Sequence, residues 1–190
     1  MQKRRTFTVM AILLAVLVLG VGYAAIANVT LNLNGTGNIM ANADFAVVYD
    51  TSHTIAKTSG TVTDGTNTQT IVTASYTSTT LATMTVWLDD THREAYAIFK
   101  VDNNSTDLSA RLTPSVTEVG QQHDAYFNDI QAEYYTASTC ATGEELGTDV
   151  LEAGDSAYLK VTVSLEKSPL DDITGATFSV QTTAEPVEAD

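Results

Sequence analysis

The residues that could carry acid–base, nucleophilic or metal chemistry are few and widely spaced. The chain has three histidines and a single cysteine: His53, His92, His123 and Cys140. No His-Glu-x-x-His motif places two histidines on one face of a helix, and no Gly-x-Ser-x-Gly motif presents a serine nucleophile. The spacing therefore predicts no catalytic residue, no metal ligand and no cofactor, so we expect a protein that is not an enzyme.

Acidic residues near two turns allow two weaker metal hypotheses. His92 lies two residues from both Asp90 and Glu94, but a solvated charged turn is the simpler explanation of that spacing. The acidic pairs at residues 89–90 and 171–172 could bind calcium, yet neither shows the alternating oxygen ligands of a calcium loop. We expect solvated turns at both places.

Cys140 cannot form a disulfide within its own chain, because the chain has no second cysteine. In an exported protein it is either a free thiol or a link between two chains. In both cases the fold must be held by its core and its hydrogen bonds.

The first 27 residues have the three-part pattern of a secretory signal peptide. A cationic start, Lys3-Arg4-Arg5, precedes an uncharged run from residue 9 to residue 27. A helix over that run would measure roughly 28 Å, close to the thickness of a bilayer's apolar core. The small-x-small sequence Ala25-Ile26-Ala27 predicts cleavage after Ala27 and export, whereas the length of the run leaves retention as a membrane anchor open. The arginine pair fits either a twin-arginine signal or an ordinary cationic flank.

The chain is strongly acidic. Its 190 residues carry a net charge of −14, and the part after Ala27 carries −17, because it holds all 23 acidic residues and six of the nine basic ones. Such a surface repels nucleic acid and anionic lipid. We therefore expect no nucleic-acid partner, and membrane contact only through residues 1–27.

The chain after residue 27 has the pattern of an all-β protein. Threonine, which favours strands, occurs 31 times. Runs of alternating apolar and polar residues are separated by turn formers: residues 71–76, 81–88, 95–101, 108–116, 130–135, 157–165 and 176–184. We predict a two-layer antiparallel β-sandwich, jelly-roll or immunoglobulin-like, over residues 28–185, with an acidic tail at residues 186–190.

Local predictions accompany this fold. Residues 51–67 are polar and rich in turn formers, which indicates a long loop or a weak hairpin. Residues 150–165 have the pattern of a hairpin whose second strand buries one face. Trp87 is expected in the core, and Pro114 at a sheet edge or strand end.

Two stretches share one layout. Residues 88–101 and 151–163 both contain a strand end, an acidic turn, the dipeptide Ala-Tyr and an alternating strand. This similarity indicates either two related halves of a sandwich or two unrelated hairpins.

Several short stretches carry a family resemblance: residues 20–24, 31–36, 97–106, 165–169 and 177–180. In these motifs, and in layout over most of its length, the chain resembles the TasA/camelysin-like family. These are exported biofilm matrix fibre proteins of Gram-positive bacteria that carry SipW-type signal peptides. The resemblance implies a jelly-roll subunit that polymerises outside the cell.

The resemblance also implies how the subunits join. In such fibres the strand at the mature N-terminus leaves its own subunit and completes a sheet of the next one. The matching residues here are 28–39, in which Val29, Leu31 and Leu33 share one face and would fill an apolar site on the neighbour. Pairing of this strand within its own sheet remains open.

Three functions follow as hypotheses. The first is an extracellular structural subunit of a biofilm matrix fibre or surface filament, in contact with copies of itself and with cell-surface or matrix components. The second is a monomeric or membrane-anchored surface module for binding or adhesion, to which Tyr126-Phe127 and Tyr134-Tyr135 would contribute aromatic side chains. The third, implied by camelysin alone, is a metalloprotease, against which the missing zinc motif argues.

Overall fold

A computed structural model describes residues 45–119, 127, 129–166 and 174–187. The predicted signal peptide and the strand at residues 28–39 lie outside these residues. Within the described part, every regular element is a β-strand. No helix among the described residues is long and apolar enough to span a bilayer.

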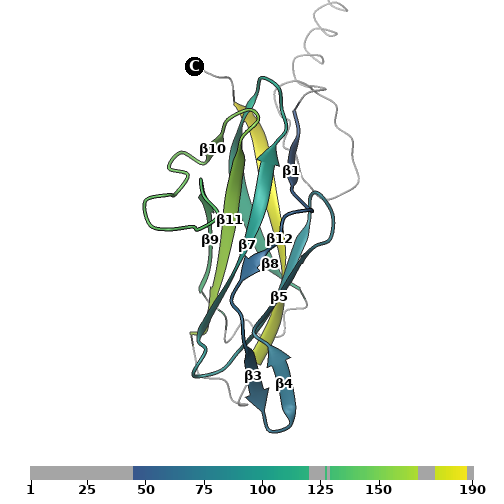
Figure 1. Cartoon of the computed structure of the whole chain (residues 1–190), viewed down its shortest axis with the longest axis vertical. Coiled ribbons are helices and arrows are strands. Elements are labelled where there is room, and N and C mark those ends of the chain that lie inside the picture. Colours follow the sequence, from purple (N-terminus) through teal and green to yellow (C-terminus); the bar gives the residue numbers. More distant parts are fainter. Residues whose placement is uncertain (1–44, 120–126, 128, 167–173, 188–190) are drawn as a thin grey trace, which may run out of the picture.

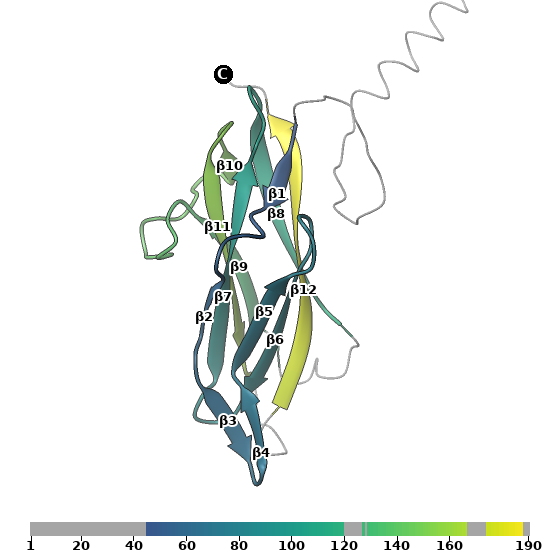
Figure 2. The ribbon, with the colours of Figure 1, turned by 45° about the vertical axis from the view of Figure 1, so that its right-hand side comes forward.

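Two five-stranded antiparallel sheets form the body of the molecule (Figures 1 and 2). The first contains, in spatial order, β10 (Val150–Leu151), β8 (Ser109–Glu118), β12 (Thr174–Val187), β6 (Ala82–Leu88) and β5 (Val72–Tyr76). The second contains β1 (Val47–Tyr49), β7 (Glu94–Asn103), β11 (Ser156–Ser164) and β9 (Asp129–Tyr135), with β2 (Ala56–Lys57) on the same edge of β7 as β1. The predicted all-β fold, consistent with a sandwich, is confirmed.

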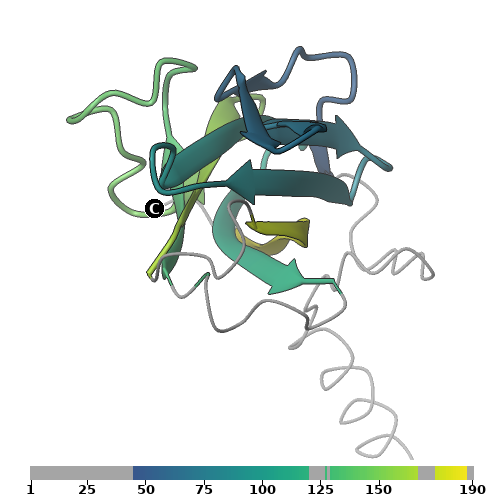
Figure 3. The ribbon, with the colours of Figure 1, turned by 90° about the horizontal axis from the view of Figure 1, so that it is seen from below.

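A small hairpin of β3 (Thr61–Asp64) and β4 (Asn67–Thr70) projects from one end of the body (Figure 2). Figure 3 looks along the sheets from that end. Of the two predictions for residues 51–67, the hairpin is therefore the one observed.

The strand pairs identify the sandwich as a jelly roll. β6 pairs with β12, β7 with β11 and β8 with β10, while a single bridge joins Tyr135, at the end of β9, to Glu145. The pairs are nested along the sequence, so that the chain forms one long antiparallel ribbon. The ribbon is folded over, and successive pairs therefore lie in alternate sheets. Each of the two similar stretches of sequence crosses from the first sheet to the second, β6 to β7 and β10 to β11.

The core comes from strict alternation along the long strands. On β11 and β12 every second side chain is almost fully buried: Ala157, Leu159, Val161 and Val163 on one sheet, and Ala176, Phe178, Val180 and Ala184 on the other. The alternating burial predicted for residues 157–165 is confirmed. β12 continues to Val187, which pairs with Ser109, so the strand runs past residue 185.

One polar contact crosses this core. The hydroxyl of Tyr134 on β9 donates a hydrogen bond to Oγ1 of Thr182 on β12 over 2.9 Å, and the hydroxyl of Tyr49 on β1 lies 3.1 Å from the same atom. Burial raises the pKa of both tyrosines above the ordinary value, so both hydroxyls remain protonated. Thr182 therefore links strands on both edges of the second sheet to the middle of the first.

The predicted hairpin over residues 150–165 is wrong. β10 pairs with β8 in the first sheet, whereas β11 pairs with β7 and β9 in the second. The turn between them is a corner fastened by the buried Asn103, whose Nδ2 donates to the carbonyl oxygens of Leu151 and Glu152 over 3.1 Å each.

The expectation that Trp87 lies in the core holds only in part, because the side chain packs against the core cluster without being fully buried. The core face of β6 is occupied by Ala82, Met84, Val86 and Leu88, and alternation turns Trp87 to the outer face, where it is half-buried. Its ring covers Gly175 on the neighbouring strand so closely that a Cβ there would lie 2.5 Å from the indole. The tryptophan therefore caps a glycine on the outside of the sheet.

Candidate functional site

The two open sides of the sandwich differ in the strands that form their edges. The β1–β5 side has edge strands β1, β2 and β5, and the β8–β9 side has edge strands β9 and β10, of which β10 pairs with only two residues of β8. On the β1–β5 side and the adjoining hairpin, some covering residues are almost fully buried: Val47, Tyr49, Val62, Ile71 and Val72. Others there are half-buried against the core: Phe45, Ile55, Ala74 and Tyr76. On the β8–β9 side, residues in the middle of β8 and β9 are half-buried: Pro114, Val116, Ile130 and Ala132. Among the described residues, both sides therefore carry half-buried core side chains, and in the first sheet the β8–β9 side has the shorter edge strand, β10 rather than β5.

These half-buried side chains belong to the core layer. Val116 pairs with Val180 across the first sheet, and Ile130 pairs with Val163 across the second, and both partners are fully buried. Because directly opposed residues in an antiparallel pair share one face, Val116 and Ile130 point inward. Inward-facing apolar side chains are therefore partly exposed to solvent along this side.

The backbone edge of β8 is paired over only part of its length. Its neighbour β10 pairs with Ala110 and Arg111, and one more hydrogen bond runs from the amide of Leu112 to the carbonyl oxygen of Asp149 over 2.7 Å. Beyond Leu112, no described strand pairs with this edge. Among the described residues, the jelly roll is thus incomplete at its β8–β10 pair and at β9, which has a single bridge to Glu145 in place of a partner strand on that side.

The ladder between β8 and β12 determines which main-chain groups point outward. The amide of Val119 donates to the carbonyl oxygen of Thr177 over 2.7 Å, so the odd-numbered residues of β8 bond to β12 and the even-numbered ones face away. Val116 therefore directs its N–H and C=O to the open edge, while Pro114 has no N–H to direct there. This position confirms the prediction that Pro114 lies at a sheet edge.

Two aromatic side chains close the core at either end of the open stretch. Phe127 is buried and packs edge to face on Phe178, with ring centroids 6.0 Å apart. Tyr134 closes the other end through its hydrogen bond to Thr182. Between them, the β8–β9 side offers main-chain donors and acceptors beside apolar side chains, which is what a docking β-strand requires.

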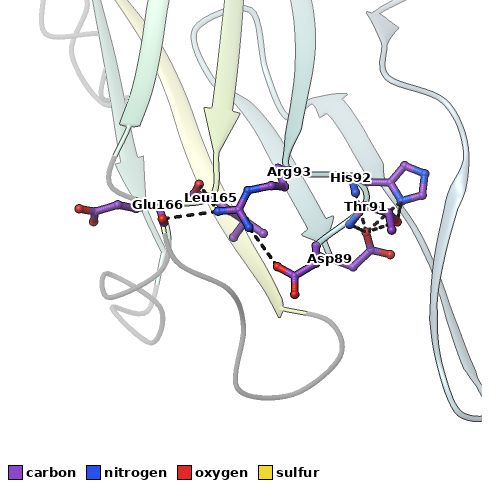
Figure 4. Close-up of polar contacts among 7 residues, drawn as sticks. Asp89, Thr91, His92, Arg93, Leu165 and Glu166 are labelled. Atoms are coloured by element: carbon purple, nitrogen blue, oxygen red, sulfur yellow. Dashed lines mark hydrogen bonds and ion pairs between the residues drawn. The ribbon is translucent and has the colours of Figure 1, made fainter.

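The charged turn that follows β6 is held together by its own hydrogen bonds (Figure 4). Oδ1 of Asp89 accepts from the amides of Thr91 and His92 over 2.8 and 2.6 Å and lies 3.0 Å from Nδ1 of His92. Partial burial of Asp89 opposes its ionisation, but the hydrogen bonds outweigh burial and hold the pKa of the carboxyl below its ordinary value. Asp89 therefore acts as the acceptor that shapes the turn.

Arg93 joins the same turn to the end of β11. It pairs with Asp90 at 3.0 Å and donates to the carbonyl oxygen of Leu165 over 3.1 Å (Figure 4). His53 lies elsewhere, edge-on to the ring of Tyr158, and His123 is outside the described residues. Within the described part of the chain, no three His, Cys, Asp or Glu side chains come together as a metal site would require.

A second charged cluster fastens the end of β1 to β7. Nζ of Lys100 lies 3.0 Å from a carboxylate oxygen of Asp50 and 3.0 Å from one of Asp102. Hydrogen bonds to Asp50 and Asp102 raise the pKa of Lys100 to about 12, and hydrogen bonds from Ser52 and Lys100 lower that of Asp50. Both partners are therefore held in their ionised forms, as in an ion pair and unlike a proton-transfer site.

Cys140 is a buried free thiol in a small second core. Its neighbours there include Ile98 and Tyr135, on the outer face of the second sheet. Burial raises the pKa of the thiol to about 11, so it is a poor nucleophile at neutral pH. The choice between a lasting free thiol and a link between two chains stays a prediction.

The aromatic pairs proposed for ligand binding are not an exposed platform. Tyr134, Tyr135 and Phe127 are buried, and Tyr126 lies outside the described residues. Sequence patterning therefore misplaced these side chains.

The candidate donor residues Val29, Leu31 and Leu33 lie outside the described residues, so their position stays a prediction. The open β8–β9 side was not predicted from the sequence. Its one signal was Pro114 within an alternating strand, which marks an edge but not an incomplete one.

No protein family, no curated protein and no solved structure matches this chain.

Proposed function

We propose that this chain is a structural subunit that acts outside the cell and assembles into filaments, with residues 28–39 of one copy docking on the β8–β9 side of another. The observation that carries the proposal is the half-paired edge of β8 beside half-buried core residues. An added strand would pair with the main-chain groups of Val116 and cover the inner apolar side chains. The proposed role is mechanical, without catalysis or a cofactor.

The length and composition of residues 28–39 suit this site. At about 3.4 Å per residue, the alternating part at residues 28–36 spans roughly 30 Å, enough to follow the open part of β8 at residues 112–118. Val29, Leu31 and Leu33 would lie on the face turned toward Val116 and Ile130. Residues 28–39 contain no charged side chain, so this segment can approach an exported chain of net charge −17 without repulsion.

The polarity of the molecule supports a head-to-tail arrangement. β1 pairs at Val47 with Asn103, at the end of the body opposite the β3–β4 hairpin (Figure 2). The open part of β8 runs toward the hairpin end, since Val119 bonds to Thr177 near the start of β12. A strand that leaves one copy at the first end and docks near the other end of the next would repeat without closing, which produces a filament.

Electron microscopy of the exported chain with paired substitutions tests the proposal. Leu31→Asp with Leu33→Asp should abolish filaments, because it places charge on the apolar face of the docking strand. Asn32→Asp with Asn34→Asp adds the same charge to the opposite face and should leave filaments intact. Filaments that survive the first pair as well as the second would refute docking through residues 28–39.

A proteolytic role is tested separately. The purified chain should leave casein intact with or without a chelator, and cleavage that the chelator stops would overturn the structural assignment.

A further inference from the structure

The outer face of the first sheet is an uncharged array of hydroxyl groups. Register places its side chains in four rows across the strands: Thr73, Thr85, Thr177 and Val119; Ser75, Thr83, Ser179 and Thr117; Gln181 and Ser115; Thr183 and Thr113. We call these residues the hydroxyl face. None of them is charged, although the chain carries 23 acidic residues. Arg111 and Glu185, which pair across β8 and β12, border the array at one end, and Trp87 borders it at the other.

The hydroxyl face also carries apolar surface. Val119, 58% exposed, is the one large hydrophobic residue that is more exposed than buried among the described residues. Each threonine adds a methyl group beside its hydroxyl, and Trp87 at the border is only half-buried. Cross-strand contacts between Thr85 and Thr177 at 3.0 Å, and between Ser75 and Thr83 at 3.2 Å, hold some of these side chains in fixed positions. An ordered surface with methyl groups and without charge costs less to remove from water than a charged one, provided that its hydroxyl groups find hydrogen-bond partners.

We propose that the hydroxyl face is the lateral contact between copies of this chain, so that neighbouring filaments pack sheet to sheet through it. Two features point to a second copy as the occupant. A hydroxyl both donates and accepts hydrogen bonds, so an identical face can satisfy it. The outer face of the second sheet, by contrast, carries charges of both signs, among them Glu94, Lys100, Asp102, Glu133 and Lys160, so contact there would remove charged groups from water.

The size of the hydroxyl face sets the strength of the contact. At about 4.8 Å between strands and 6.8 Å between alternate residues, the rows cover roughly 400 Å² per copy. A stable interface between proteins buries about 800 Å² per partner. One pair of faces is therefore too weak to hold two free chains, whereas repetition along a filament multiplies the contact. In this form the inference rests on the proposed filament, although the contact itself is testable without it.

Matched charge substitutions test the contact. Thr177→Glu places a carboxylate in the hydroxyl face, and Thr162→Glu places one on β11 in the second sheet; both threonines are half-buried in the interior of their sheets. Wild type and Thr162→Glu should form laterally paired filaments in electron micrographs, and Thr177→Glu should form single filaments. Thr177→Gln, similar in size and uncharged, should restore pairing. Circular dichroism confirms that each variant is folded.

Beads densely coated with the full chain test the contact without requiring filaments. Wild-type and Thr162→Glu beads should cluster, and Thr177→Glu beads should stay dispersed. If the chain forms no filaments but its beads still cluster in a way that depends on Thr177, the proposed filament is wrong and the proposed contact is supported. The proposed contact would be refuted if Thr177→Glu filaments paired, or Thr177→Glu beads clustered, as much as those of Thr162→Glu. It would also be refuted if wild-type filaments and wild-type beads both remained separate.

Discussion

The β1–β5 side and the β8–β9 side are opposite edges of one sandwich, and the sheets end differently on each. On the β1–β5 side, Tyr76 packs against Tyr49 and Phe99 with ring centroids 5.7 and 5.9 Å apart, and its hydroxyl accepts the amide of Lys100 over 3.0 Å. On the β8–β9 side, β10 covers two residues of β8 and a single bridge follows β9. Among the described residues, aromatic packing therefore joins the two sheets on the first side, whereas on the second side most of β8 has no strand beside it.

The largest expected effect lies on the β1–β5 side. Ile71 is 1% exposed beside the β3–β4 hairpin, where its Cδ1 lies 3.1 Å from the position a Cβ on Gly60 would take. Ile71→Ala should lower the free energy of unfolding by about 2–5 kcal/mol, because it removes buried methyl groups and leaves a cavity. Urea unfolding measures this loss. A change below about 1 kcal/mol would mean that Ile71 is not packed as described.

Proline substitutions distinguish the two edges of β8. Thr117→Pro removes an amide that bonds to β12 and should lower the free energy of unfolding by about 3 kcal/mol or more. Val116→Pro removes an amide that faces the open edge and should cost the isolated chain less than about 1 kcal/mol.

The same pair separates stability from assembly. Val116→Pro should abolish filaments while the chain stays folded, because the docking strand loses a main-chain donor. Equal destabilisation by the two prolines would show that the open edge is already paired within one copy.

The contact that spans both sides is expected to have an intermediate effect. Thr182→Val leaves the hydroxyls of Tyr49 and Tyr134 without their shared partner in the core and should destabilise the fold by about 1–3 kcal/mol. Thr183→Val, on the outer face one residue away, should change stability by no more than about 0.5 kcal/mol. The same urea experiment compares them, and equal effects would contradict the Thr182 link.

A smaller effect on stability than at Ile71 or Thr182 is expected at Ile130. Because Ile130 is half-buried, Ile130→Ala should cost the unassembled chain about 1 kcal/mol, clearly less than Ile71→Ala. Filament formation should nevertheless weaken, since the docking strand loses an apolar contact. Sedimentation gives the assembly threshold, and a threshold unchanged from wild type would remove Ile130 from the docking site.

Strand positions could be predicted from the sequence because alternation is local, and residues 157–165 are the clearest case. The prediction for Trp87 holds only in part, because its size suggested the core, while its parity within β6 put it on the outer face. The error at residues 150–165 has a different origin, since a tight turn does not specify whether its two strands stay in one sheet. That choice depends on Asn103, which lies far away in the chain and has the composition of a surface turn.

The candidate site was beyond prediction for a related reason. Whether the edge of β8 is fully paired depends on how many residues of β10 lie beside it, which the sequence of β8 itself does not specify. Pro114 marked the edge, and residues 28–39 suggested a donor strand. Nothing in the local sequence of Val116, Ile130 or Ala132 distinguishes them from fully buried core residues.

Hydrogen exchange at β8 in the exported chain tests the central claim most directly. In wild-type filaments the amide of Val116 should exchange slowly, because a strand from another copy bonds to it. In the Leu31→Asp, Leu33→Asp chain the same amide should exchange at least ten times faster, a change of about 1.4 kcal/mol in protection, while the amide of Thr117 stays protected by β12 in both. Rapid exchange of Val116 in wild-type filaments, or equal protection in the two chains, would contradict docking on the β8–β9 side.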